Sequence, residues 1–232
     1  MNDSLSEFES IKKFNRECDV DINKLIGFSK KQDDIQLFIS SAVVLLGAKF
    51  ESCIESLIEE YVNKINSKSN KGSIPDELKY SSIYNKFCKY KEHINKNHFD
   101  CFSTKSDFLD DFSSFVITIM DNSNALEINN KFDYGKHGYK ELVKLFKNIA
   151  INIEEDKFNK FPKDGLFQGI IQEISFKDEF NKFTNNRNIV IHQNECPNIT
   201  DDDVLGIVDI FKQFIEKIGI EINDRLQNMK WI

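Results

Sequence analysis

Three polar side chains that could do chemistry together fall within the six-residue segment RNIVIH at positions 187–192. His192 can accept and release a proton near neutral pH, as a general base must. Arg187 carries a permanent charge with paired donors, which suits it to stabilise negative charge developing on oxygen atoms. Asn188 lies four residues before His192 and shares its face of a helix. The chain has only three arginines and four histidines, although short spacings of this kind also arise by chance.

The segment around Arg187 repeats its apolar residues with a heptad rhythm: Phe176, Phe180, Phe183 and Val190. Continuing that rhythm places Arg187 on the same stripe, where packing alone would favour Leu or Phe. Burying a guanidinium is costly unless another group pairs with it. We therefore expect Arg187 to have a partner.

Helix geometry limits how Arg187 and His192 can act together. Five residues of an ideal α-helix leave the two side chains about 140° apart. They converge if the helix ends between them, or if a second copy of the chain supplies the facing group. The β-branched residues at 189–191 and the Cys196-Pro197 step make an early end plausible. The alternative is that Arg187 pairs with a core carboxylate and His192 is a surface residue at a helix end.

A long helix is expected from Asp33 to about Ser67. Its apolar stripe is Ile39, Val43, Leu46, Phe50, Ile54, Leu57 and Tyr61. A second face carries the small pair Gly47 and Ala48, which lets a neighbour come close, and then Glu51 and Glu55. These carboxylates point either toward whatever packs there or into solvent, where glutamate is usually found.

The whole chain, 1–232, is predicted to form one all-α domain. This domain is a bundle with long antiparallel helices and an N-terminal helical extension at 1–32. Further helices are expected at 4–15, from Pro75, at 107–120, 124–130 and 139–149, and from Phe167 into the central segment. At 107–120 the β-branched residues leave a strand-like insertion as the alternative. Loops are expected at 66–74, 97–106, 131–139 and 152–162. The loop at 131–139 contains Tyr134 and His137 and either frames a site or is a simple turn. A capping box of Thr200 and Asp203 starts the last long helix, to Asn228.

Composition narrows the classes of partner and compartment. The net charge of −7 and pI of about 5.3 give no global basic field, so contact with nucleic acid must be local or assembled between subunits. Five cysteines at irregular spacings, without a CxxC motif, suggest reduced thiols in a reducing compartment. The polar N-terminus predicts no signal peptide, and no apolar run approaches the roughly 20 residues of a membrane span. We expect a cytoplasmic protein without membrane contact.

No cofactor motif is apparent, and no acidic cluster suggests a metal site. The three consecutive residues Asp201, Asp202 and Asp203 fan around a helix start, which suits capping better than metal binding.

Together these features resemble the HEPN superfamily, most closely its RiboL-PSP-type domains. The resemblance covers roughly residues 34–225. It rests on Phe50-Glu51, an aromatic-Glu pair early in the long helix, and on the Arg187-Asn188-x-x-x-His192 element before the last helix. Val-Ile-His-Gln stands here where Ala-His-Gly is common in the family, so Gln193 replaces a glycine after the histidine.

The resemblance implies a helical bundle that forms a homodimer and brings two Arg/His pairs into one cleft. It implies metal-independent RNA cleavage by attack of a 2′-hydroxyl, with Arg187, Asn188 and His192 in the site and Glu51 and Glu55 in support. The expected substrate is tRNA or mRNA, in a toxin-like or antiviral defence role with an antitoxin or regulatory partner. One alternative is a catalytically silent HEPN module for dimerisation or RNA binding, and another is a helical scaffold unrelated to RNA.

Overall fold

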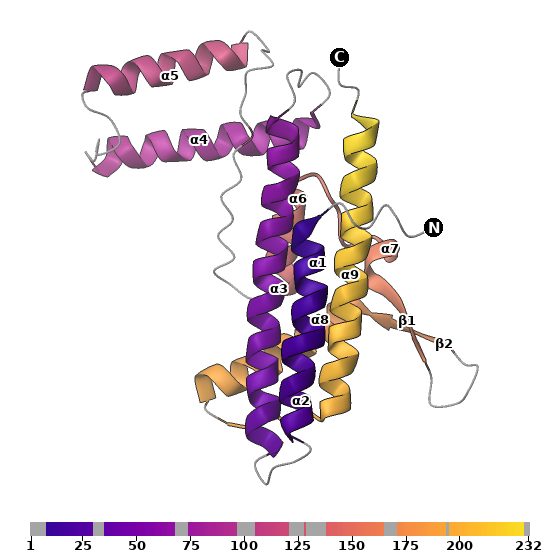
Figure 1. The fold of residues 1–232 in the computed structure, drawn as a ribbon. Helices are drawn as coiled ribbons and strands as arrows, with labels where there is room; N and C mark the ends of the chain where they lie inside the picture. The colour runs from indigo at the N-terminus through magenta and orange to yellow at the C-terminus, as the bar shows by residue number, and fades with distance from the viewer. Residues whose placement is uncertain are drawn as a thin grey trace.

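Helix α3 (Ile35–Asn66) is the axis of an all-α bundle, with α1 (Glu9–Glu17), α8 (Phe176–Asn188) and α9 (Asp201–Asn228) packed around it (Figure 1). The computed structural model describes residues 8–29, 35–67, 74–96, 105–120, 128, 138–164, 171–193 and 195–229. The expected all-α fold is confirmed.

The two longest helices are those expected from the apolar periodicity, with 32 residues in α3 and 28 in α9. The stripe of α3 is at most 2% exposed: Ile39, Val43, Leu46, Phe50, Ile54, Leu57 and Tyr61. The stripe of α9 is at most 5% exposed: Val204, Val208, Phe211, Ile215, Ile218 and Ile222. The capping box is present, because the Thr200 hydroxyl accepts from the Asp203 N–H and the Asp203 carboxylate accepts from the Thr200 N–H.

The N-terminal helices belong to the same core. Helix α1 continues through a π-helical turn, η2 (Cys18–Ile22), into α2 (Asn23–Ser29), and this whole arm runs antiparallel to α3, whereas α9 runs parallel to α3 (Figure 1). Lys49 of α3 forms ion pairs with carboxylates of α1 and η2 at 3.0 and 2.8 Å. Gly219 of α9 leaves room for Ile11, whose Cδ1 would lie 2.5 Å from an added Cβ.

Helices α4 (Asp76–Lys96) and α5 (Lys105–Met120) form a separate arm that lies across one end of α3 (Figure 1). Three aromatic residues hold them together in a small cluster apart from the main core: Tyr90, Phe108 and Phe115. The helices expected from Pro75 and at 107–120 are thus confirmed, with Pro75 immediately before α4.

The region between α6 (Tyr139–Lys147) and α8 differs from the expectation. The expected loop at 152–162 contains a short helix, α7 (Asp156–Asn159), and the start of a strand. Strands β1 (Lys160–Asp164) and β2 (Ile171–Ser175) pair antiparallel, with Phe161 opposite Ile174. The expected helical lead-in from Phe167 is therefore wrong over 171–175. The helix expected at 124–130, apart from residue 128, and most of the loop at 131–139 lie outside the described residues.

By length and composition α3 could cross a membrane, contrary to the expectation that no run approaches a span. A core helix of a soluble protein meets the same criteria. Here α3 carries Lys49 and Glu51 near its middle, both ion-paired to neighbouring helices, and its apolar stripe is covered by α1, α8 and α9.

Candidate functional site

Helix α8 carries the candidate residues and is fixed against α3 and α9 by aromatic side chains. Ser175 caps its first turn by accepting a hydrogen bond from the Asp178 N–H. Phe176 stacks on Phe214 of α9, with ring centroids 3.9 Å apart and planes 5° from parallel. Phe180 packs against Phe50 of α3, with centroids 5.6 Å apart. Packed rings of this kind fix the rotation of α8 about its axis.

That rotation points Arg187 into the contact between α8 and α3. The residue is 9% exposed, and its Nη1 lies 2.5 Å from Oε1 of Glu51. The carboxylate is itself mostly covered, with a side chain 20% exposed. The ion pair thus meets the requirement that a buried guanidinium have a partner.

Gly47 provides the space in which the arginine lies. A Cβ at this position would stand 2.8 Å from Nε and 2.9 Å from Cδ of Arg187, closer than such atoms approach. Any other residue at 47 would therefore push the side chain aside. Among the residues that the structure describes, none forms a hydrogen bond with the buried Nε, so the guanidinium is held by its ion pair with Glu51 and by the space that Gly47 leaves.

The α-helix ends directly after Arg187, at Asn188, and continues as one π-helical turn, η3 (Ile189–Gln193). Hydrogen bonds of a π-helix join residues five apart, and such turns occur often at functional sites. Because this winding turns less per residue, it reduces the angle between Arg187 and His192 below that of an α-helix. Asn188 is half-buried, and His192 is exposed.

The residues expected in the site therefore differ in their burial and in their partners. Glu51 points toward the neighbouring helix and forms an ion pair with Arg187, whereas Glu55 is exposed to solvent. Each of the two orientations considered for these glutamates therefore occurs once. The early end of α8 agrees with the expectation. The structure also matches the alternative interpretation, in which Arg187 pairs with a core carboxylate and His192 lies exposed at a helix end. In one chain alone, therefore, the histidine is exposed to solvent and the arginine is nearly covered.

Two other features bear on the site. Within the described ranges, no three His, Cys, Asp or Glu side chains gather as metal ligands would. The loop residues Tyr134 and His137 lie outside those ranges. In the sequence, the role of Gly47 was indicated only by the small pair Gly47-Ala48. The group that approaches Gly47 is the side chain of Arg187, and Ala48 is exposed.

An all-α bundle with an Arg-Asn-x-x-x-His element at the end of the helix before the last one defines a HEPN-type domain. The family model of the RiboL-PSP-HEPN domain matches residues 2–224, and the chain belongs to this family. The match includes the N-terminal helices, which lay outside the span of the resemblance. No curated protein and no solved structure matches the chain.

Proposed function

We propose that this protein is a metal-independent endoribonuclease that cleaves RNA in a site formed by two copies of the chain. The observation that carries the proposal is Arg187, a nearly buried guanidinium fixed by Glu51 and Gly47 in a HEPN-family bundle, with Asn188 and His192 on the turn that follows. Membership of the family supports an RNase-like or RNA-binding module, and the residues supply the finer assignment.

The chemistry follows from the residue types. His192 of one copy removes the proton from a ribose 2′-hydroxyl, whose oxygen attacks the adjacent phosphorus atom. The bond from phosphorus to the 5′-oxygen breaks, and His192 of the other copy returns a proton to that leaving oxygen. Arg187 stabilises the charge on the non-bridging oxygens, and Asn188 orients His192 or donates to a phosphate oxygen. The products are a 2′,3′-cyclic phosphate and a 5′-hydroxyl.

We place this activity in the cytoplasm, on tRNA or mRNA, in a toxin-like or antiviral defence role controlled by an antitoxin or regulatory partner. The net charge of −7 favours a local RNA contact over attraction by the whole surface.

The test is incubation of the pure protein with total RNA in EDTA beside a His192→Ala control. We expect cleavage that persists in EDTA and leaves 2′,3′-cyclic phosphate ends. Arg187→Lys should lose most of the activity at matched folded fraction, because one ammonium cannot replace the two-pronged guanidinium. A His192→Ala protein that cuts RNA as fast as the parent would end the proposal.

The ion pair with Glu51 favours a second candidate, a catalytically silent module for dimerisation or RNA binding. In that case Arg187 serves to join α8 to α3, and its substitution lowers stability without changing any RNA product. Undegraded RNA that remains bound to the parent protein would favour this second function.

A further inference from the structure

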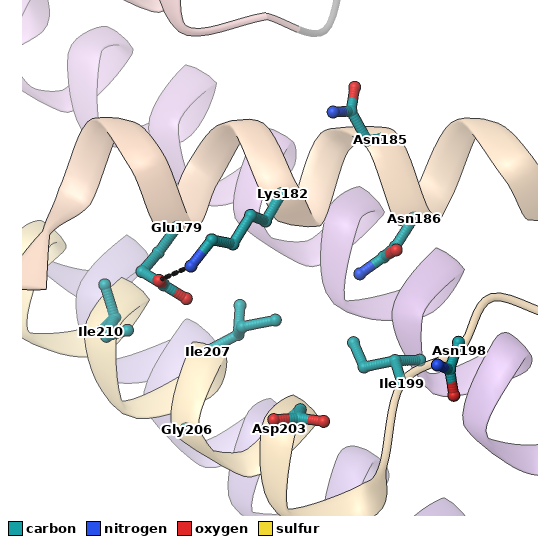
Figure 2. A pocket seen from close by; sticks show the side chains of 10 residues that line it. All are labelled: Glu179, Lys182, Asn185, Asn186, Asn198, Ile199, Asp203, Gly206, Ile207 and Ile210. Atoms are coloured by element: carbon teal, nitrogen blue, oxygen red, sulfur yellow. Dashed lines mark hydrogen bonds and ion pairs between the residues drawn. The ribbon is translucent and has the colours of Figure 1, made fainter.

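A cavity of about 420 Å³ lies between α8 and the first turns of α9 (Figure 2). Three isoleucines, each at most 6% exposed, give it an apolar wall: Ile199, Ile207 and Ile210. Gly206 lines it as well, and a Cβ on this glycine would meet no atom within 4 Å, so the cavity is open above the glycine. The volume lies within the range of pockets that hold small organic ligands.

Two of the side-chain amides that line the cavity lie close to its apolar wall. Asn186 extends from α8 toward Ile199, and Asn198 stands beside Ile199 on the segment that enters α9 (Figure 2). Asn185 of α8 lines the cavity as well. Among the residues that the structure describes, neither Asn186 nor Asn198 has a side-chain hydrogen-bond partner. An amide offers both donors and an acceptor, as the edge of a nucleobase does.

The charges around the cavity oppose a phosphate. Lys182 lies 2.6 Å from the Glu179 carboxylate and is neutralised by it. Asp203, whose carboxylate accepts a hydrogen bond from the Thr200 N–H in the capping box, is the second carboxylate in the lining. One cation against two carboxylates leaves the lining net negative, which repels an anion and favours groups that donate hydrogen bonds. Carboxylates accept from exocyclic amino groups of bases, as they do from N4 of cytosine.

We propose that this cavity binds an unpaired nucleobase that carries an exocyclic amino group, in preference to uracil. The apolar wall covers the face of the base, and Asn186 and Asn198 bond its edge. Asn186 directly precedes Arg187, so the cavity and the candidate site adjoin on neighbouring sides of α8. The inference thus deepens the proposed function, by assigning a base preference to an RNA strand whose phosphate reaches Arg187.

Gly206→Leu is the sharpest variant, because a Cβ at this position meets no atom within 4 Å, the longer side chain would occupy the cavity, and leucine favours the helix. Gly27→Leu is the matched control, since a Cβ at Gly27 in α2 also meets no atom within 4 Å and Gly27 does not line the cavity. Both variants are made in a His192→Ala background, so that bound RNA stays intact. Fluorescence anisotropy with labelled hexamers of adenosine, cytidine or uridine then gives the affinities.

We expect the His192→Ala protein to bind the adenosine and cytidine hexamers more tightly than the uridine hexamer. Gly206→Leu should weaken those two about tenfold and remove the preference, whereas Gly27→Leu should change neither. Asn198→Ala should reduce the preference by loss of one hydrogen-bonding group. Base preference without any cleavage by the parent would support the cavity and contradict the nuclease.

Equal affinity for all three hexamers would overturn the inference, as would a preference that survives in Gly206→Leu. A Gly206→Leu protein that loses self-association while keeping its base preference would show that the cavity is a protein contact, and this outcome also overturns it.

Discussion

At the scale of single residues, the position of Arg187 depends on Gly47. In Gly47→Ala the new methyl group would collide with Nε and Cδ of the arginine, while the helix itself gains about 1 kcal/mol from the better helix former. We therefore expect a folded protein whose RNA cleavage falls about 100-fold, because small displacements of a catalytic group cost that much. Cleavage rates and circular dichroism measure the two effects.

Gly27→Ala is the control for this substitution, since it gives the same propensity gain with no atom within 4 Å of the new methyl group. It should keep the parent rate. A Gly47→Ala protein that cuts RNA at the parent rate would show that the measured position of Arg187 is not required.

The pair of Arg187 and Glu51 should appear as a coupled unit in unfolding experiments. Glu51→Ala leaves the nearly covered guanidinium of Arg187 without its carboxylate, and Arg187→Ala removes the same ion pair, so each should cost about 2–3 kcal/mol of unfolding free energy. The double variant should cost clearly less than their sum. Glu55→Ala, on the same face but exposed, should stay within about 0.5 kcal/mol of the parent. Strict additivity in urea titrations would argue against the pair.

The sequence alone predicts the contacts of individual residues less completely than it predicts the helices. The heptad rhythm required a partner for Arg187, and the face of α3 offered Glu51 and Glu55. The choice between two glutamates one turn apart depends on where α8 crosses α3, which the packed phenylalanines decide. The π turn that follows Asn188 also has no sequence signature beyond three β-branched residues.

At the scale of elements, a charged contact joins α9 to α7 and predicts a pH dependence. Partial burial raises the pKa of the Glu221 carboxyl, but hydrogen bonds from Lys157 and Arg225 outweigh it and leave the pKa below its usual 4.5. A lowered folded pKa contributes stability above the unfolded pKa, and the contribution is lost as pH falls through the folded value.

Glu221→Gln should therefore melt at a lower temperature than the parent at about pH 7, and the gap should close as the solution becomes more acidic than the folded pKa. Thermal melts of both proteins across this range measure the gap. A gap that is constant with pH would mean that the charge of Glu221 does not stabilise the contact.

The helices could be predicted from the sequence where the apolar residues repeat with helical spacing over many turns. The buried stripes of α3 and α9 extend over many turns, and the Thr200–Asp203 box marks where α9 begins. The hairpin of β1 and β2 was not predictable in this way, because each strand has only five residues and β1 contains Pro162. Short segments of this kind take their structure from the neighbours on which they pack.

At the scale of the whole molecule, the expected homodimer needs a new argument. The sequence left open whether the partner of Arg187 comes from the same chain or from a second copy, and Glu51 of the same chain pairs with it. Large apolar side chains that remain exposed on the arm of α4 and α5 now favour association: Tyr80, Tyr84, Leu109, Ile117 and Met120. Sedimentation at micromolar concentration should give twice the chain mass of 27.1 kDa, and a monomer would count heavily against a shared site.

Sharing of the site can be tested apart from association, by mixing two inactive proteins. Arg187→Lys keeps its histidine and His192→Ala keeps its arginine, so a mixed dimer contains one intact copy of each in the same cleft. If the site combines residues of both copies, mixed dimers purified through two different tags should recover part of the RNA cleavage, because the remaining His192 still acts as the base and the remaining Arg187 still stabilises the phosphate. If each chain holds a complete site, the mixed dimer is as inactive as its components, and that result would contradict the two-chain cleft while leaving association intact.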